Sequence, residues 1–196
     1  MAKTIDLSKY KKLWTTKKKV EEIQNSENAE TRAEILRYYW PKTWKPIWKI
    51  WWRLLAHRVF SEYDRLYYSD DHWYCNCITC NLRMFWQEPE WWCQAGHFIK
   101  RSSSIYTFDL LNVYPQCKHC NLILEWNYIP YTLVMINKLW KEKVEEMENN
   151  KRQTVEYDQK RYEEHILEWY KYIKEKKELI WKMSNENGLD IEKMEF

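Results

Sequence analysis

The stretch VYPQCKHCN, residues 113–121, contains two cysteines separated by two residues, and CITC, residues 77–80, repeats this spacing. A two-residue spacer allows both sulfur atoms of a pair to turn toward one metal ion. Together the pairs supply four thiolates, the ligand set of a tetrahedral structural zinc site. The sequence therefore predicts a core held by Zn²⁺ on Cys77, Cys80, Cys117 and Cys120.

The interval between the two pairs is long. Its 36 residues exceed the roughly 15 to 20 that separate the pairs of a zinc ribbon, so further structure must be built there. A disulfide framework is the alternative, but nothing in the chain indicates an oxidising compartment. Cys75 and Cys93 are expected to be buried thiols, and Cys75 can replace Cys77 as a ligand only with an altered geometry of the pair.

The composition is that of a soluble folded protein, with 45% hydrophobic and 31% charged residues among 196. Most of the fourteen tryptophans and fifteen tyrosines must lie in the core, because so much exposed aromatic area would promote association. There is no run of 18 apolar residues, and the basic N-terminus lacks an apolar signal core. We therefore expect no membrane span and no export.

Positive charge is concentrated in the first third of the chain. Residues 1–19 carry seven lysines against one aspartate, and no acidic residue lies between Glu34 and Glu62. This asymmetry indicates a basic face for a polyanion, although a solvated surface explains it equally well. If the partner is DNA, we expect Lys45, Lys49 and Arg53 to contact it.

Helical periodicity brackets the cysteine-containing part. We expect helix over much of 30–66, with breaks near Pro41 and Pro46 and an apolar stripe through Leu55 and Val59. Two further helices, 131–148 and 155–183, are expected to form a hairpin beside the core. The predicted apolar side of the first of these consists of Leu133, Ile136, Leu139, Trp140, Val144 and Met147.

Zinc bound by four thiolates is a closed site, so any chemistry must come from other side chains. His97 lies between the pairs and follows Gly96, the only glycine in the first 187 residues. Asn112 precedes the second pair and Asn121 follows it directly. Glu125 shares a helical face with Asn121 if a helix starts near Cys117.

The order CxxC, GH, then N-x-x-x-x-C-x-x-C-N resembles an HNH-type ββα-metal nuclease framed by two zinc knuckles. More narrowly, the phage NinG (Rap) recombination endonucleases are similar in RVFSEYDRL, CITC, AGHFIKRS, FDLLNVYPQCKHCN and NYIPY. The resemblance covers roughly residues 50–135. It does not extend to the ends, where a lysine-rich lead replaces the family's cysteine-rich N-terminal segment. The phage endonuclease VII type of junction resolvase is more distantly similar.

The resemblance implies a mainly α protein with a small β-hairpin that carries His97, a loop that carries Asn112, and a helix from the second knuckle. We expect three parts: a basic helical region 1–66, the zinc-bound core 67–130 and a C-terminal helical hairpin 131–196. The implied activity is cleavage of branched DNA, such as Holliday junctions or D-loops, during phage recombination. The protein would then act in the cytoplasm of a bacterial host, encoded by a phage or prophage.

Phosphodiester hydrolysis requires an activated water and a stabilised leaving oxygen. We assign His97 as the general base, oriented by Asn112 through a backbone or side-chain hydrogen bond. Asn121 and Glu125 are predicted ligands of a catalytic Mg²⁺ or Mn²⁺, because hard cations prefer oxygen. Lys100 and Arg101 follow the strand and are placed to hold a phosphate.

Two positions depart from the patterns. Many HNH nucleases carry a metal-binding aspartate where this chain has Gly96, so Glu125 or Asp109 is the candidate for the missing ligand. We expect Gly96 to leave space for a metal and a phosphate. The NinG pattern tends to carry an arginine where this chain has Thr107, so Arg101 is expected to supply that phosphate contact.

Two other functions remain open. One is an HNH nuclease of restriction or homing type that acts on linear duplex, although an obvious specificity domain is missing. The other is a zinc-stabilised DNA-binding protein without catalysis. Symmetric resolution of a junction needs two active sites, so a homodimer is expected.

Overall fold

The computed structural model describes residues 29–39, 51–86, 93–101 and 105–186. The chain divides into two compact units, residues 1–51 and residues 52–196. In the first unit the structure describes helix α2, Ala29–Tyr39. Among the described helices, none is long and apolar enough to cross a membrane.

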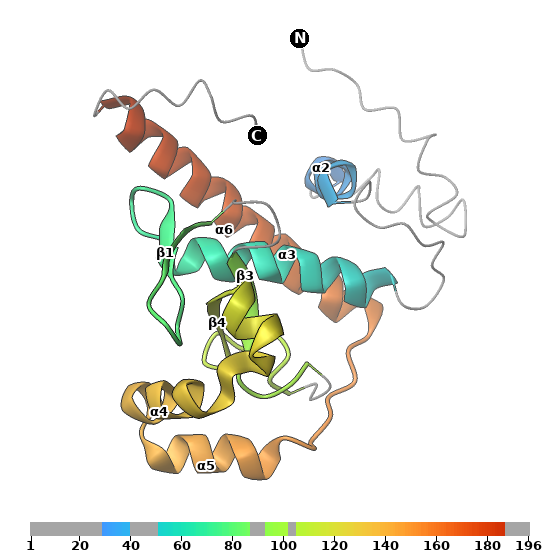
Figure 1. The fold of residues 1–196 in the computed structure, drawn as a ribbon. Coiled ribbons are helices and arrows are strands. Elements are labelled where there is room, and N and C mark those ends of the chain that lie inside the picture. Colours follow the sequence, from blue (N-terminus) through green and yellow to red (C-terminus); the bar gives the residue numbers. More distant parts are fainter. Residues whose placement is uncertain (1–28, 40–50, 87–92, 102–104, 187–196) are drawn as a thin grey trace. The chain divides into compact units, whose positions relative to one another are not determined.

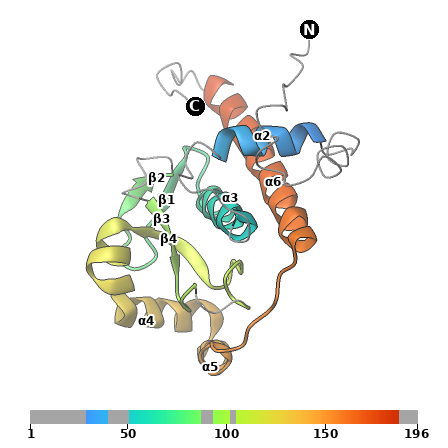
Figure 2. The same ribbon diagram turned by 90° about the vertical axis from the view of Figure 1, so that its right-hand side faces the viewer.

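Two small antiparallel hairpins (Figure 2) carry five of the six cysteines, and Cys120 lies in the turn that follows the second hairpin. Strands β1, Tyr74–Asn76, and β2, Arg83–Phe85, pair around the first knuckle, with Cys75 opposite Met84. Strands β3, Cys93–His97, and β4, Val113–Cys117, pair so that Cys93 lies opposite Cys117 and His97 opposite Val113. The expected hairpin with His97 on its first strand is thus confirmed.

Helices α3, Trp51–Tyr67, and α6, Gln159–Glu186, lie side by side (Figures 1 and 2). Aromatic rings fill the contact between them: Phe60 and Trp169 have centroids 4.9 Å apart, and Tyr63 and Tyr172 are 5.0 Å apart. Leu55 and Val59 of the predicted stripe are buried. Of these four rings, Phe60 and Trp169 are buried and Tyr63 and Tyr172 are half-buried, so the prediction that the aromatic residues belong to the core is confirmed in part here.

The segment after the second knuckle is not one continuous helix. A π-helical turn, His119–Ile123, is followed by a 3-10 turn, Glu125–Asn127, and then by α4, Tyr128–Leu139. A second break follows at Trp140, which has φ 68° and ψ 155° and separates α4 from α5, Lys141–Asn150. The expectation of a single helix over 131–148 is wrong, because Trp140 adopts a backbone conformation that no helix contains.

The helical hairpin at the C-terminal end is formed by other elements than expected. Helices α4 and α5 pack against each other, whereas α6 returns to α3 (Figure 1). The break also rotates the buried face, so that Leu133 and Trp140 are exposed and Tyr131, Met135, Val144 and Met147 are buried. These four join Phe98, Ile99, Tyr106 and Tyr114 in one hydrophobic cluster.

Some predictions fall outside the described residues. Lys45 and Lys49 belong to this group, as do the expected helix breaks near Pro41 and Pro46. The division of the chain at residues 66 and 130 stays a prediction.

Candidate metal centre and adjacent basic site

The four cysteines of the two knuckles converge. The sulfur atoms of Cys77, Cys80, Cys117 and Cys120 all lie within 4.8 Å of one another. The sulfurs of Cys80 and Cys117 are 3.8 Å apart. A tetrahedron with Zn–S bonds of about 2.3 Å has edges of about 3.8 Å, so this spacing fits a zinc ion.

The backbone around the cluster is arranged for thiolates. The amide N–H of Cys117 points to the sulfur of Cys77 at 3.3 Å, and that of Cys120 points to the sulfur of Cys117 at 3.4 Å. Burial opposes ionisation of Cys77, but the Cys117 amide and the Thr79 hydroxyl outweigh it and lower its pKa to about 7. The predicted donor set therefore fits a metal ion such as zinc, which would be a structural ion here.

Cys75 and Cys93 form a separate buried pair, with sulfur atoms 3.0 Å apart. The hydrogen bond between them, together with burial, raises the pKa of the Cys93 thiol. The prediction of two buried thiols is confirmed, and Cys77 rather than Cys75 belongs to the metal-binding group.

Gly96 is required by a neighbouring side chain rather than by a metal. A Cβ atom built on Gly96 would lie 2.8 Å from the Cβ of Gln116, on the paired strand. Gln116 is fully buried and donates to the carbonyl of Trp126 at 2.7 Å. The space expected for a metal and a phosphate is thus filled by Gln116.

His97 lies at the end of β3 and is 5% exposed. Its Nε2 is 3.0 Å from the carbonyl oxygen of Thr107. Because a carbonyl only accepts, Nε2 carries a proton in this contact. Burial, reinforced by Arg101, lowers the pKa of His97 to about 4, although hydrogen bonding to the carbonyls of Thr107 and Ala95 raises it.

Asn112 holds the loop after β3 instead of contacting the imidazole through its side chain. Its Oδ1 accepts from the Ile99 amide at 2.6 Å, and its Nδ2 donates to the carbonyls of Ile99 and Tyr106 at 3.0 and 2.9 Å. Its own carbonyl accepts from Phe98 at 2.9 Å. Asn112 therefore fixes the backbone on both sides of the loop that brings Thr107 to His97.

His57 is a residue of this site that the sequence reasoning did not identify. It lies on α3, and burial, Arg101, His97 and Arg53, in that order, lower its pKa to about 3. Arg53 also points an Nη2 to the carbonyl of Arg101 at 3.5 Å. Two histidines and two arginines are thus gathered where α3 meets the loop after β3. Only the regular helical spacing of Arg53 and His57 signalled this, since residues four apart share a face.

The predicted ligands of a catalytic cation are not brought together on a helix. Asn121 lies in the π-helical turn and donates from Nδ2 to Gln94 at 2.7 Å, a contact that leaves its oxygen unused. Glu125 is exposed and has φ 49°, beyond the end of that turn. Asp109 accepts from the Leu111 amide at 2.8 Å in a turn. Among the described residues, the four-cysteine cluster is the only close group of three or more His, Cys, Asp or Glu ligand atoms.

Lys100 and Arg101 directly follow Ile99, and both are exposed. The Lys100 ammonium lies 4.8 Å from the centre of the Trp126 ring. Arg101 uses its carbonyl to accept from Thr107 Oγ1 at 3.2 Å. Thr107, which stands where the NinG pattern tends to have arginine, therefore contacts both Arg101 and His97.

Comparison with known proteins identifies the family. The family model described as "Bacteriophage Lambda NinG protein" matches residues 2–179. The chain belongs to the NinG family. Within it, the "Protein ninG" chains of Escherichia phage 933W and Enterobacteria phage VT2-Sa are each 33% identical over 75 residues. These alignments span 38% of this chain and 35% of each NinG relative. No solved structure matches the chain.

The NinG match includes the lysine-rich lead that the motif-based resemblance left uncovered. The match ends inside α6, at residue 179. It therefore includes all of α3, the helix on which His57 lies. The chain aligns with only about a third of the length of each of these curated relatives.

Proposed function

We propose that the chain is a metal-dependent endonuclease that hydrolyses phosphodiester bonds in branched DNA, such as Holliday junctions and D-loops. The observation that carries the proposal is the placement of His97. It lies on a strand paired with the second knuckle, it is held by a backbone carbonyl, and it has Arg101 nearby. NinG family membership supports the phage setting.

His97 has the properties of a general base. A pKa near 4 keeps the ring neutral at pH 7, which is the form that accepts a proton from water. The bond from Nε2 to Thr107 fixes the ring plane. Asn112 supports this arrangement indirectly, by fixing the loop that carries Thr107.

The phosphate would be bound by the cations around the ring. Arg101 is close enough to influence both histidines, and Arg53 influences His57 and Arg101. An anionic phosphate between the two arginines would relieve their mutual repulsion. A bound Mg²⁺ or Mn²⁺ would neutralise charge on the phosphate and the departing oxygen. Asn121 offers an amide oxygen for such an ion, and Glu125 stays a proposed second ligand.

The test compares His97→Asn with wild type on four-way, flap and linear duplex DNA. The asparagine amide is polar but cannot act as a base, so we expect cleavage to fall by at least about 100-fold. Zinc content, circular dichroism and junction binding should be unchanged. His72→Ala, at an exposed histidine, is the matched control and should cleave normally.

Each outcome separates the candidate functions. Cleavage that survives in His97→Asn removes His97 from the mechanism. Equal or better cutting of linear duplex by wild type favours the restriction or homing type of nuclease. The burial of His97 favours a second candidate, a zinc-stabilised DNA-binding protein without catalysis. Junction binding by wild type without cleavage in Mg²⁺ or Mn²⁺ would support it.

Two active sites are needed for symmetric cutting, so we also propose that a homodimer acts on each junction.

A further inference from the structure

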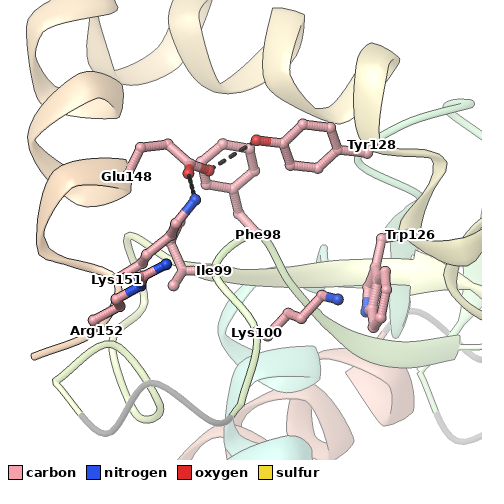
Figure 3. A pocket seen from close by; sticks show the side chains of 8 residues that line it. All are labelled: Phe98, Ile99, Lys100, Trp126, Tyr128, Glu148, Lys151 and Arg152. Carbon is pink, nitrogen blue, oxygen red and sulfur yellow. Dashed lines mark hydrogen bonds and ion pairs between the residues drawn. The ribbon is translucent and has the colours of Figure 1, made fainter. Parts of the chain in front are cut away.

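Figure 3 shows a pocket of about 410 Å³, and His97 is not among the residues that line it. Its floor is formed by Phe98 and Ile99, which directly follow His97 along the chain. Trp126 and Tyr128 form aromatic walls. The volume lies within the range of roughly 300–1,000 Å³ typical of small-ligand sites.

The rim of this pocket is positively charged. Lys100, Lys151 and Arg152 line it, against a single acidic residue, Glu148. That carboxylate is already engaged, because it accepts from Tyr128 Oη at 2.8 Å and pairs with Lys151 at 2.8 Å (Figure 3). The pocket therefore combines an apolar floor, aromatic faces and a cationic rim.

Trp126 is held in place by an unusual backbone. Glu125, Trp126 and Asn127 have φ values of 49°, 69° and 49°, in the left-handed region that non-glycine residues rarely adopt. The buried Gln116 amide donates to the Trp126 carbonyl at 2.7 Å, and Asn127 Nδ2 points to the sulfur of Cys120 at 3.6 Å. The metal knuckle and the β3–β4 hairpin thus fix the position of the tryptophan.

We propose that this pocket binds one unpaired nucleotide of the DNA substrate. In a duplex the faces of the bases are covered by stacking, and the outer surface presents sugars and phosphates. An unpaired base exposes an apolar face that can stack on Trp126, while its phosphate meets Lys151 and Arg152. The ammonium of Lys100, which now covers the Trp126 ring, moves to the phosphate when the base enters.

The inference rests on the proposed function and gives it a source of substrate preference. Ile99 and Lys100 lie two and three residues after His97, just beyond the end of β3, so a nucleotide in the pocket lies next to the phosphate that is cut. Flaps and D-loops carry unpaired bases, and a four-way junction can open a base pair at its crossover, where stacking is interrupted. Linear duplex would have to extrude a base to fill the pocket, at an unpairing cost.

The experiment measures binding of the full-length, zinc-loaded protein to fluorescent four-way junctions by anisotropy, without added divalent cation. One junction carries an unpaired thymidine at the crossover, and the matched probe has an abasic residue at that position. We expect wild type to prefer the thymidine probe by roughly tenfold. Trp126→Ala should lose the preference, and Trp126→Phe should retain most of it.

Two further variants make the result specific. Trp181→Ala removes an exposed tryptophan on α6 that does not line the pocket, and it should keep the full preference. Arg152→Gln, at an exposed position, should weaken both probes about equally, because it removes a phosphate contact. It keeps the inference testable if Trp126→Ala fails to fold.

Equal affinity of wild type for the two probes, or an unchanged preference in Trp126→Ala, would overturn the pocket assignment. Either result leaves the nuclease proposal intact if His97-dependent cleavage persists. Failure of wild type to bind any of the junctions would overturn both.

Discussion

At the scale of single residues, the most informative group is the pair His57 and His97 with the two arginines beside them. Each histidine is held neutral by burial and by nearby positive charge. A neutral imidazole next to cations is costly to protonate, so these two histidines bind a proton less readily in the folded state than in the unfolded chain. The stability of the fold therefore depends on pH, whatever the function of the protein is.

We predict that the free energy of unfolding falls as the pH is lowered from 7 to 5. The folded pKa values of about 3 and 4 lie below the ordinary value of about 6.5, so stability is present above pH 6.5 and is lost as the pH falls toward the folded values. Each histidine should contribute about 2 kcal/mol to this loss.

The measurement is urea unfolding of wild type and His57→Asn at pH 7 and pH 5. The difference between the two pH values should be smaller in the variant by about 2 kcal/mol. Thiolate protonation at the metal site acts in both proteins and cancels in this comparison. An identical pH dependence would mean that His57 titrates normally in the folded protein.

At the scale of elements, the feature that separates α4 from α5 is the backbone of Trp140. Its φ of 68° and ψ of 155° lie in a region that is essentially restricted to glycine. The side chain is 76% exposed, so packing does little to offset this strain. The sequence around it, KLWKEK, contains no glycine or proline and is compatible with an uninterrupted helix.

Replacing Trp140 with glycine should therefore stabilise the α4–α5 hairpin. We expect the free energy of unfolding to rise by about 1 kcal/mol, measured by denaturant titration. Glu145→Gly, at an exposed position inside α5, is the control and should lower it by about 1 kcal/mol. Destabilisation by Trp140→Gly would indicate that α4 and α5 form one helix in solution.

At the scale of the whole molecule, the four-cysteine cluster connects the two hairpins. The Ile78 amide of the first knuckle donates to the Pro115 carbonyl of β4 at 2.9 Å, so the knuckles also share a backbone contact. Because the strands are only three to five residues long, the hairpins have few other contacts to hold them. The metal is therefore expected to be essential for folding of this unit.

We predict about one zinc ion per chain after exhaustive dialysis. Cys117→Ser should lose the ion and more than about 5 kcal/mol of stability, as measured by metal analysis and thermal unfolding. Cys93→Ser, at a buried cysteine outside the cluster, should retain the ion. A metal-free wild type with Cys77 and Cys80 oxidised would contradict the four-thiolate assignment.

The spacing of residues along the sequence was sufficient to predict part of the fold and part of the candidate site. The two C-x-x-C pairs specified the metal cluster, since each pair is set by a short stretch of backbone. The resemblance to the HNH and NinG patterns placed His97 on the hairpin. The apolar spacing of α3 predicted the burial of Leu55 and Val59. By itself, then, the sequence determined the ligand set, the hairpin and the helical character of the flanks.

Only the tertiary structure decided how these parts meet. Gly96 is needed because the pairing register places Gln116 against it, and register is a property of two strands. His57 reaches His97 because α3 packs beside the loop after β3, and α6 pairs with α3 because their aromatic rings interlock. These contacts join residues tens of positions apart, and their energies depend on burial and charge that no local pattern contains.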